Sequence, residues 1–198
     1  MFSLMPAEVD ERLKPGEAPG DYVLRLAQSK AVACAGSAHD EHVIIAADTT
    51  VVLGKDILVK PRSISEAVEM LTCLRGRTHQ VYTGIAVLRV RDNRLLTDLC
   101  VTDVPMREYS DGEISTYVAT GDPLDKAGAY AIQHPRFQPV GKISGCYASV
   151  MGLPLCHLQR TLLQLEVAPA ADVPGNCQSA LRYQCSISRA VLRSEQVG

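Results

Sequence analysis

Apolar and polar positions along the chain fall into blocks that predict a series of strands and helices. The clearest block is residues 44–53, an apolar and largely β-branched run that is typical of a strand buried on both faces. Asp48 interrupts this run, and a buried carboxylate is costly unless it is paired, hydrogen-bonded or bound to a metal. The pattern leaves two interpretations open. Either the strand carries a functional carboxylate in its middle, or it ends at Ala47 and Asp48 begins a turn.

The region before this strand predicts a loop and then a helix. Residues 2–9 predict a short extended segment, and the proline and glycine positions of residues 14–20 are typical of a loop. Asp21 is a suitable N-cap for a helix over residues 22–35, whose apolar positions recur at helical spacing. Lys30 lies on or near its apolar face, where the pattern alone favours a lysine whose stem covers apolar surface.

The remaining β-rich runs also predict strands. Residues 51–53 with 57–59, and residues 78–90 with 95–106, are expected to pair as hairpins with turn residues between them. Short strands are expected near residues 140–143 and 147–150.

Two capping boxes mark further helices. Ser63 with Glu66 opens a helix that reaches residue 75, and Ser110 with Glu113 opens a helix that reaches residue 119. Pro154, close to the first helical position, opens an amphipathic helix through residue 165.

The amino-acid composition of the chain changes after Glu166. Residues 167–175 resemble a proline-containing linker, and residues 176–198 carry weak helical periodicity with a mild positive charge. The order of elements therefore predicts an α/β domain over residues 1–166, with a mixed β-sheet flanked by helices, followed by a linker and tail of unknown role over residues 167–198.

Composition excludes several classes of function. The formal net charge of the 198 residues is −2 without a basic stripe, so we expect no nucleic-acid partner. No apolar run approaches the roughly 20 residues that cross a bilayer, and the N-terminus has no basic region typical of a signal peptide. Seven cysteines without a CxxC pair indicate reduced thiols. We therefore expect a cytoplasmic protein without a membrane partner.

The charged residues indicate phosphate chemistry. Two carboxylates, Glu11 and Asp48, together with Lys30, Lys60 and Lys126, are the minimum set for binding a divalent metal and a polyphosphate. The chain has no Walker loop, no dinucleotide-binding glycine motif and no nucleophile elbow. A phosphate-handling enzyme is accordingly the function that the pattern favours.

A set of short motifs, in a fixed order between residues 2 and 166, carries a family resemblance. They are Glu8-Val9-Asp10-Glu11, Arg25-Leu26-Ala27-x-x-Lys30-Ala31, Ala47-Asp48-Thr49, Lys60-Pro61, Gly76-x-Thr78-His79-x-Val81-Tyr82-Thr83-Gly84, Asp125-Lys126-Ala127-Gly128-Ala129-Tyr130-x-Ile132-Gln133 and Val150-x-Gly152-Leu153-Pro154. The series closely resembles the Maf family of nucleoside triphosphate pyrophosphatases, which is related in fold to the inosine triphosphatases.

This resemblance implies hydrolysis between the α- and β-phosphates of a nucleotide, which yields a monophosphate and pyrophosphate. Asp48 matches the proton acceptor for the attacking water, and Asp48 with Glu11 matches the acidic positions near a divalent cation, Mg²⁺ or Mn²⁺. Lys30 and Lys60 match phosphate-facing lysines. Thr49 and Gln133 match positions linked to base choice, and this pair resembles the branch that acts on dTTP and UTP, with CTP or modified pyrimidine nucleotides as further candidates.

Other residues in the motifs have simpler interpretations. Thr78, His79 and Tyr82 are expected to be structural or to form a pocket wall. Asp125 and Lys126 either pair with each other or line the site, and the position of Arg62 relative to phosphate is open.

The chain also departs from the family pattern at its start. Family members normally begin with a strand and a Ser-x-Ser-Pro-Arg-Arg turn, whose arginines hold the triphosphate, and this sequence has neither. The account we favour is a start recorded too late. The alternatives are a shortened form that binds nucleotide with little catalysis, or a degraded reading frame. The rival function is a nucleotide-binding or septum-associated regulatory protein, and the resemblance suggests a homodimer.

Overall fold

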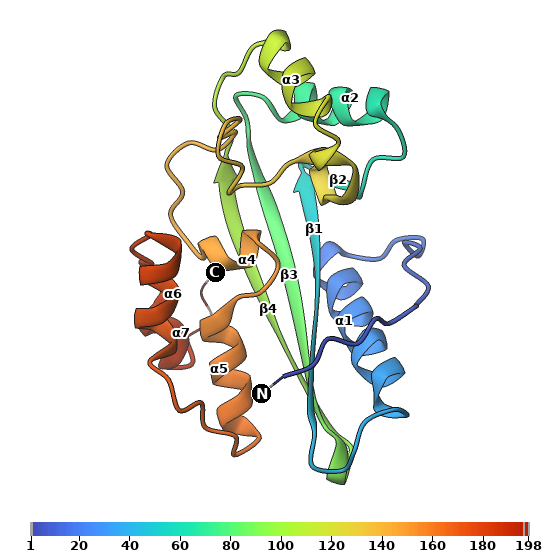
Figure 1. Cartoon of the computed structure of the whole chain (residues 1–198), viewed down its shortest axis with the longest axis vertical. Coiled ribbons are helices and arrows are strands. Elements are labelled where there is room, and N and C mark those ends of the chain that lie inside the picture. Colours follow the sequence, from blue (N-terminus) through green and yellow to red (C-terminus); the bar gives the residue numbers. More distant parts are fainter. Residues whose placement is uncertain (1, 196, 198) are drawn as a thin grey trace.

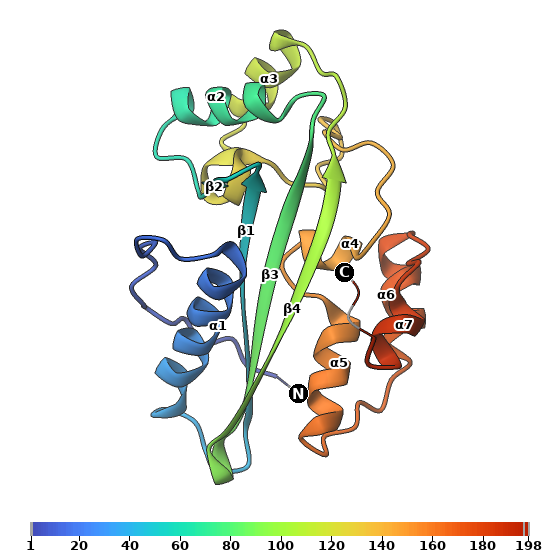
Figure 2. The same ribbon diagram turned by 180° about the vertical axis from the view of Figure 1, so that it is seen from behind.

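The fold is built on one twisted sheet with helices on both of its faces (Figures 1 and 2). A computed structural model describes residues 2–195 and residue 197 of the chain. Within them the sheet has the strand order β2-β1-β3-β4. Its strands are β1 (Val43–Leu53), β2 (Asp56–Leu58), β3 (Thr78–Arg89) and β4 (Arg94–Pro105), and a 3₁₀ turn, η1 (Val90–Asp92), joins β3 to β4.

Strand β1 runs unbroken through Asp48, so the interpretation that the strand ends at Ala47 is wrong. Both predicted hairpins are confirmed. The α/β class with a helix-flanked sheet is confirmed as well, but every pairing among the described strands is antiparallel rather than mixed, since hairpins and one helical connection reverse the chain between neighbours. The predicted extended segment at residues 2–9 joins no strand.

Helix α1 (Pro19–Ala35) covers one face of the sheet, packing on β1 and β3. It begins two residues before the predicted N-cap Asp21, because Pro19 occupies the first turn, where its lack of an N–H is harmless, and Ala18 is the N-cap. Gly84 on β3 makes the packing close. A Cβ at this position would lie 2.8 Å from the backbone of Val23 and Leu24, so only glycine lets α1 approach the sheet here.

One end of the sheet is closed by α2 (Ile64–Leu74), α3 (Asp111–Val118) and the turns η2 (Asp122–Asp125) and η3 (Ala127–Ala129), which bury the largest apolar cluster (Figure 1). The capping box of Ser110 and Glu113 is confirmed. The predicted capping box of Ser63 and Glu66 is only half formed. The Ser63 hydroxyl accepts from the Glu66 N–H, but the Glu66 carboxylate accepts from the N–H of Arg62 instead.

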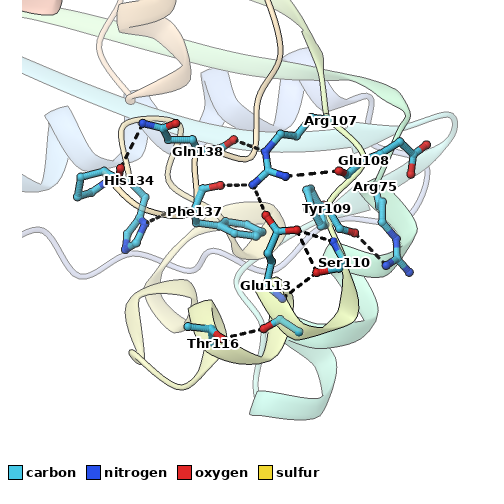
Figure 3. A network of polar contacts seen from close by, with 12 residues as sticks. Arg75, Arg107, Glu108, Tyr109, Ser110, Glu113, Thr116, His134, Phe137 and Gln138 are labelled. Carbon is cyan, nitrogen blue, oxygen red and sulfur yellow. Dashed lines mark hydrogen bonds and ion pairs between the residues drawn. The ribbon is translucent and has the colours of Figure 1, made fainter.

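Arg107 connects α3 to the loop around residue 137 at this end of the sheet (Figure 3). Its guanidinium donates to the Glu113 carboxylate at 2.7 Å and to the carbonyls of Phe137 at 2.5 Å and Gln138 at 2.8 Å. The Phe137 N–H donates in turn to Nδ1 of His134 at 2.9 Å. The loop after residue 133 is thereby fixed to α3, which matters because Gln133 is a predicted site residue.

The opposite face is covered by α4 (Tyr147–Val150), α5 (Leu155–Gln164), α6 (Val173–Leu181) and α7 (Ser188–Leu192) (Figure 2). The strands predicted near 140–143 and 147–150 are wrong. Val140 forms only an isolated bridge with Met106, and residues 147–150 form one helical turn. Helices α6 and α7 pack on α5, and no helix of the described chain is long and apolar enough to cross a membrane.

Candidate active site

A cavity of about 800 Å³ opens at the edge of β1 and contains most of the predicted site residues. Strand β2 pairs only with residues 51–53 of β1, so among the described strands none pairs with the outer edge of residues 43–50. The cavity extends around this open edge. Five of the six predicted residues line it: Glu11, Asp48, Thr49, Lys60 and Gln133. The sixth, Lys30, contacts two of them.

The alternation of β1 divides the cavity into two sides. Neighbouring side chains of a strand point to opposite faces. Asp48 points to the face of α1, where Lys30 meets it, and Thr49 points to the face of α4, where it meets Thr83. The charged groups and the predicted base-selecting group are therefore adjacent in sequence but on different faces of the sheet.

On the α1 side, Lys30 bridges two carboxylates. Its Nζ lies 2.6 Å from Oδ1 of Asp48 and 2.9 Å from Oε1 of Glu11. The Asp48 side chain is 12% exposed and that of Lys30 is 22% exposed, whereas Glu11 is 47% exposed. The expectation that the Lys30 stem merely covers apolar surface is thus incomplete, because its ammonium offsets the desolvation of the Asp48 carboxylate.

The pKa values of these groups follow from burial and pairing. Burial raises the pKa of Asp48 above its ordinary value, against the opposing effect of the Lys30 ammonium. The hydrogen bond from Lys30 lowers the pKa of Glu11. Burial acts to lower the pKa of Lys30, but its hydrogen bonds to Asp48 and Glu11 outweigh this and raise it. Lys30 therefore stays charged, while the pKa values of the two carboxylates beside it shift in opposite directions from their ordinary values.

Two residues to which the sequence analysis gave no role hold Glu11 in place. The Tyr22 hydroxyl donates to the Glu11 carbonyl at 2.9 Å. The Arg25 guanidinium pairs with Glu17 at 2.6 Å and donates to the carbonyl of Arg12 at 3.1 Å, which fastens the loop of residues 10–17 onto α1. The only sequence signal for Arg25 was its place in a family motif, because its partners lie on a loop without regular structure.

Further cations surround the cavity. Lys60, Arg62, Arg12 and Lys126 line it, against the three carboxylates Glu11, Asp48 and Asp125. Lys126 pairs with Asp125 at 2.7 Å and with Asp122 at 3.1 Å, so both interpretations of the pair hold: Asp125 and Lys126 bind each other and line the site. Arg12 likewise pairs with Asp10 at 2.7 Å, so Lys60 and Arg62 are the lining cations without an ion pair among the described residues, and their charge suits a polyanionic ligand.

On the α4 side the cavity wall is less charged. It includes Gln133, Tyr130, Val150 and Gly152. The Tyr130 hydroxyl lies 2.8 Å from Nε2 of the buried His79, so the predicted structural role of His79 fits its position behind the wall. Gly128, at φ +68, lies against Val51 with no room for a side chain, which keeps the backbone of η3 close to β1.

The donor set suits a hard cation. Asp48 and Glu11 offer carboxylate oxygens beside the same Lys30 ammonium, and Mg²⁺ uses one or two protein carboxylates with water and phosphate oxygens in its remaining positions. The described residues contain no group of three or more His, Cys, Asp or Glu side chains that could hold a metal by themselves. A metal at this site would therefore need oxygens from the substrate or from water.

Comparisons with known proteins identify a family and several relatives of this chain. A sequence model of the family described as Maf-like protein matches residues 1–165. A dTTP/UTP pyrophosphatase of Photorhabdus laumondii is 46% identical over 154 residues, which are 78% of this chain and 78% of that protein. Proteins of the same name from Anaeromyxobacter dehalogenans (47% identical over 158 residues, 79% of each chain) and Geobacter sulfurreducens (43% over 164 residues, 83% of this chain and 85% of that protein) are similarly related. With a carboxylate that interrupts a buried strand at the rim of a nucleotide-sized cavity, and with relatives of this identity and coverage, the chain belongs to the Maf family.

Proposed function

We propose that this protein hydrolyses the pyrimidine nucleotides dTTP and UTP to the monophosphate and pyrophosphate. The observation that carries the proposal is the buried carboxylate of Asp48, which Lys30 pairs at 2.6 Å inside a cationic cavity of about 800 Å³. Relatives at 43–47% identity are named dTTP/UTP pyrophosphatases. CTP and modified pyrimidine nucleotides are the next substrates to try.

In the reaction, water attacks the α-phosphorus. The bond between the α-phosphorus and the oxygen that bridges it to the β-phosphorus breaks, which releases pyrophosphate. Asp48 accepts the proton of the attacking water. Its raised pKa makes it a better proton acceptor than an ordinary aspartate, while the Lys30 ammonium keeps it ionised. Lys60, which lines the cavity, and Lys30, beside Asp48 and Glu11, neutralise the negative charge of the phosphates and of the transition state in this proposal.

The same proposal includes a divalent cation, Mg²⁺ or Mn²⁺, held by Asp48 and Glu11. When bound, it would supply positive charge to the phosphate oxygens. Lys30 contacts one oxygen of each carboxylate, so the protein's own residues hold the two side chains near each other. We further propose that the protein acts in the cytoplasm, which the seven unpaired thiols support. A homodimer remains a prediction.

The test is pyrophosphate release by the purified chain, offered dTTP, UTP, CTP and GTP with Mg²⁺ or Mn²⁺. Asp48→Asn keeps the size and shape of the side chain but removes the proton acceptor, so turnover should fall by roughly 100-fold or more. Circular dichroism should show an unchanged fold. Turnover that survives Asp48→Asn would refute the role of Asp48, and a folded wild-type chain that binds UTP without turnover would favour the rival nucleotide-binding protein.

A further inference from the structure

A chain of hydroxyl groups connects the α4 side of the cavity to the buried interior beneath α4. The Oγ1 atoms of Thr49 and Thr83 lie 2.9 Å apart, and Thr83 Oγ1 donates at 2.8 Å to the backbone carbonyl of Ser149. Thr83 is fully buried, whereas Thr49 is partly exposed and lines the cavity. Thr49 and Thr83 are directly paired across β1 and β3, so their side chains share one face of the sheet.

The direction of these hydrogen bonds follows from counting protons. A threonine hydroxyl has a single proton to donate, and a carbonyl oxygen has none. Since the Ser149 carbonyl can only accept, the Thr83 proton is committed to it. The contact between Thr83 and Thr49 must then use the Thr49 proton. The Thr49 oxygen consequently presents only lone pairs to the cavity.

Reversing this direction is unfavourable because Ser149 is held rigidly. Its hydroxyl donates to the carbonyl of Cys146 at 2.7 Å, and its carbonyl also accepts from the Gly152 N–H at 2.9 Å. The Thr102 hydroxyl lies 2.8 Å from the Ser149 hydroxyl and does not contact the Ser149 carbonyl. If Thr83 turned its proton toward Thr49, two oxygen atoms 2.8 Å apart would face each other without a proton between them. The buried end of the chain therefore sets the polarity of its exposed end.

We propose that Thr83 is a positioning residue that makes Thr49 an obligate hydrogen-bond acceptor, so that the site selects pyrimidines whose ring N3 carries a proton. Uracil and thymine have such an N3–H donor, whereas N3 of cytosine is itself an acceptor and would face the Thr49 lone pairs. Gln133, which lines the same cavity, carries both an amide donor and an acceptor and can serve the neighbouring exocyclic groups. This inference rests on the proposed function in taking a pyrimidine nucleotide as the ligand.

The experiment measures binding rather than turnover. Isothermal titration gives the affinities of UTP and CTP analogues in which a methylene group replaces the oxygen between the α- and β-phosphates, together with the N3-methyl derivative of the UTP analogue. Wild-type protein should bind the UTP analogue roughly tenfold or more tightly than either of the others. Thr83→Val frees the Thr49 proton to turn toward the cavity, so this preference should fall by roughly tenfold. Thr83→Ser keeps the hydroxyl and should retain the preference.

Thr102→Val is the matched control. It removes another buried hydroxyl from the same network without touching Thr49, so thermal stability should fall as it does in Thr83→Val, but the base preference should stay. An unchanged preference in Thr83→Val, an equal loss in Thr102→Val, or wild-type protein that binds the three analogues alike would overturn the proposal. Pyrophosphate release from UTP is measured separately. A chain with the expected binding preference but no release would refute the proposed hydrolysis and leave the role of Thr83 standing.

Discussion

Lys30→Met tests whether Lys30 keeps Asp48, the proposed proton acceptor, ionised. The substitution retains an apolar stem of similar length but removes the ammonium that lies 2.6 Å from Asp48 and 2.9 Å from Glu11. Burial already raises the pKa of Asp48, and the Lys30 ammonium opposes that effect. Without the ammonium, the ionised form of Asp48 loses its partner, and the pKa of Asp48 should rise further.

The size of the effect follows from the burial of the pair. The Asp48 and Lys30 side chains are only 12% and 22% exposed, so solvent screens their interaction weakly. A hydrogen bond to a charged group contributes about 1.5–3 kcal/mol, and a change of one pKa unit corresponds to about 1.4 kcal/mol. A proton acceptor works only when it is deprotonated. The acid limb of kcat/KM against pH should therefore move to higher pH by about 1 to 2 pH units.

The assay is pyrophosphate release from UTP at saturating metal, measured from about pH 5 to about pH 9. Lys60→Met is the control, because Lys60 lines the same cavity but has the smallest influence on the pKa of Asp48. It should raise KM and move the acid limb much less. If Lys30→Met lowered the rate equally at every pH and left the acid limb in place, Lys30 would act on the phosphates alone and the reasoning would fail.

Two further predictions concern the scaffold. Gly84→Ala places a methyl group 2.8 Å from the backbone of α1, so the free energy of unfolding should fall by about 1–3 kcal/mol in urea denaturation, with a loss of turnover. Gly36→Ala is the control, because a Cβ there meets no atom within 4 Å and the residue is already in a right-handed helical conformation. Equal stability of Gly84→Ala and wild type would contradict the argument. Burial lowers the pKa of His79 from 6.5 to about 4, so the folded state loses stability as the pH falls from about 6.5 toward 4, by up to about 3 kcal/mol. His79→Gln should flatten this part of the stability curve, and an unchanged slope would show that other groups cause it.

Local patterns in the sequence predicted the central elements well. The β-branched run of β1, both hairpins and the Ser110 capping box depend on neighbours in the chain, and all are confirmed. Residues 147–150 were mistaken for a strand, because Tyr147 and Val150 favour strands locally. There the N–H groups of Ser149 and Met151 bond to carbonyls of residues 146 and 147, which closes a helical turn.

The candidate site likewise combines residues that the sequence motifs predicted with contacts that they did not predict. The motifs predicted Asp48, Thr49, Lys60, Glu11 and Gln133, all of which line the cavity, together with Lys30 beside it. The supporting contacts were not predictable, because they join residues that are remote in sequence. Thr83 and Ser149 are 66 positions apart, and nothing local marks either of them as a partner of the other.

The register between β1 and β3 explains how the adjacent residues Asp48 and Thr49 contact different partners on the two faces of the sheet. Asp48 lies opposite Gly84, and Thr49 lies opposite Thr83. The missing side chain of Gly84 lets α1 come close enough to bring Lys30 to Asp48, while the hydroxyl of Thr83 joins Thr49 to α4 on the other face. A shift of the pairing by one residue would exchange the two faces and separate both residues from their partners. Substitutions on the α1 face should therefore change the rate and its pH dependence, and substitutions on the α4 face should change the choice of base.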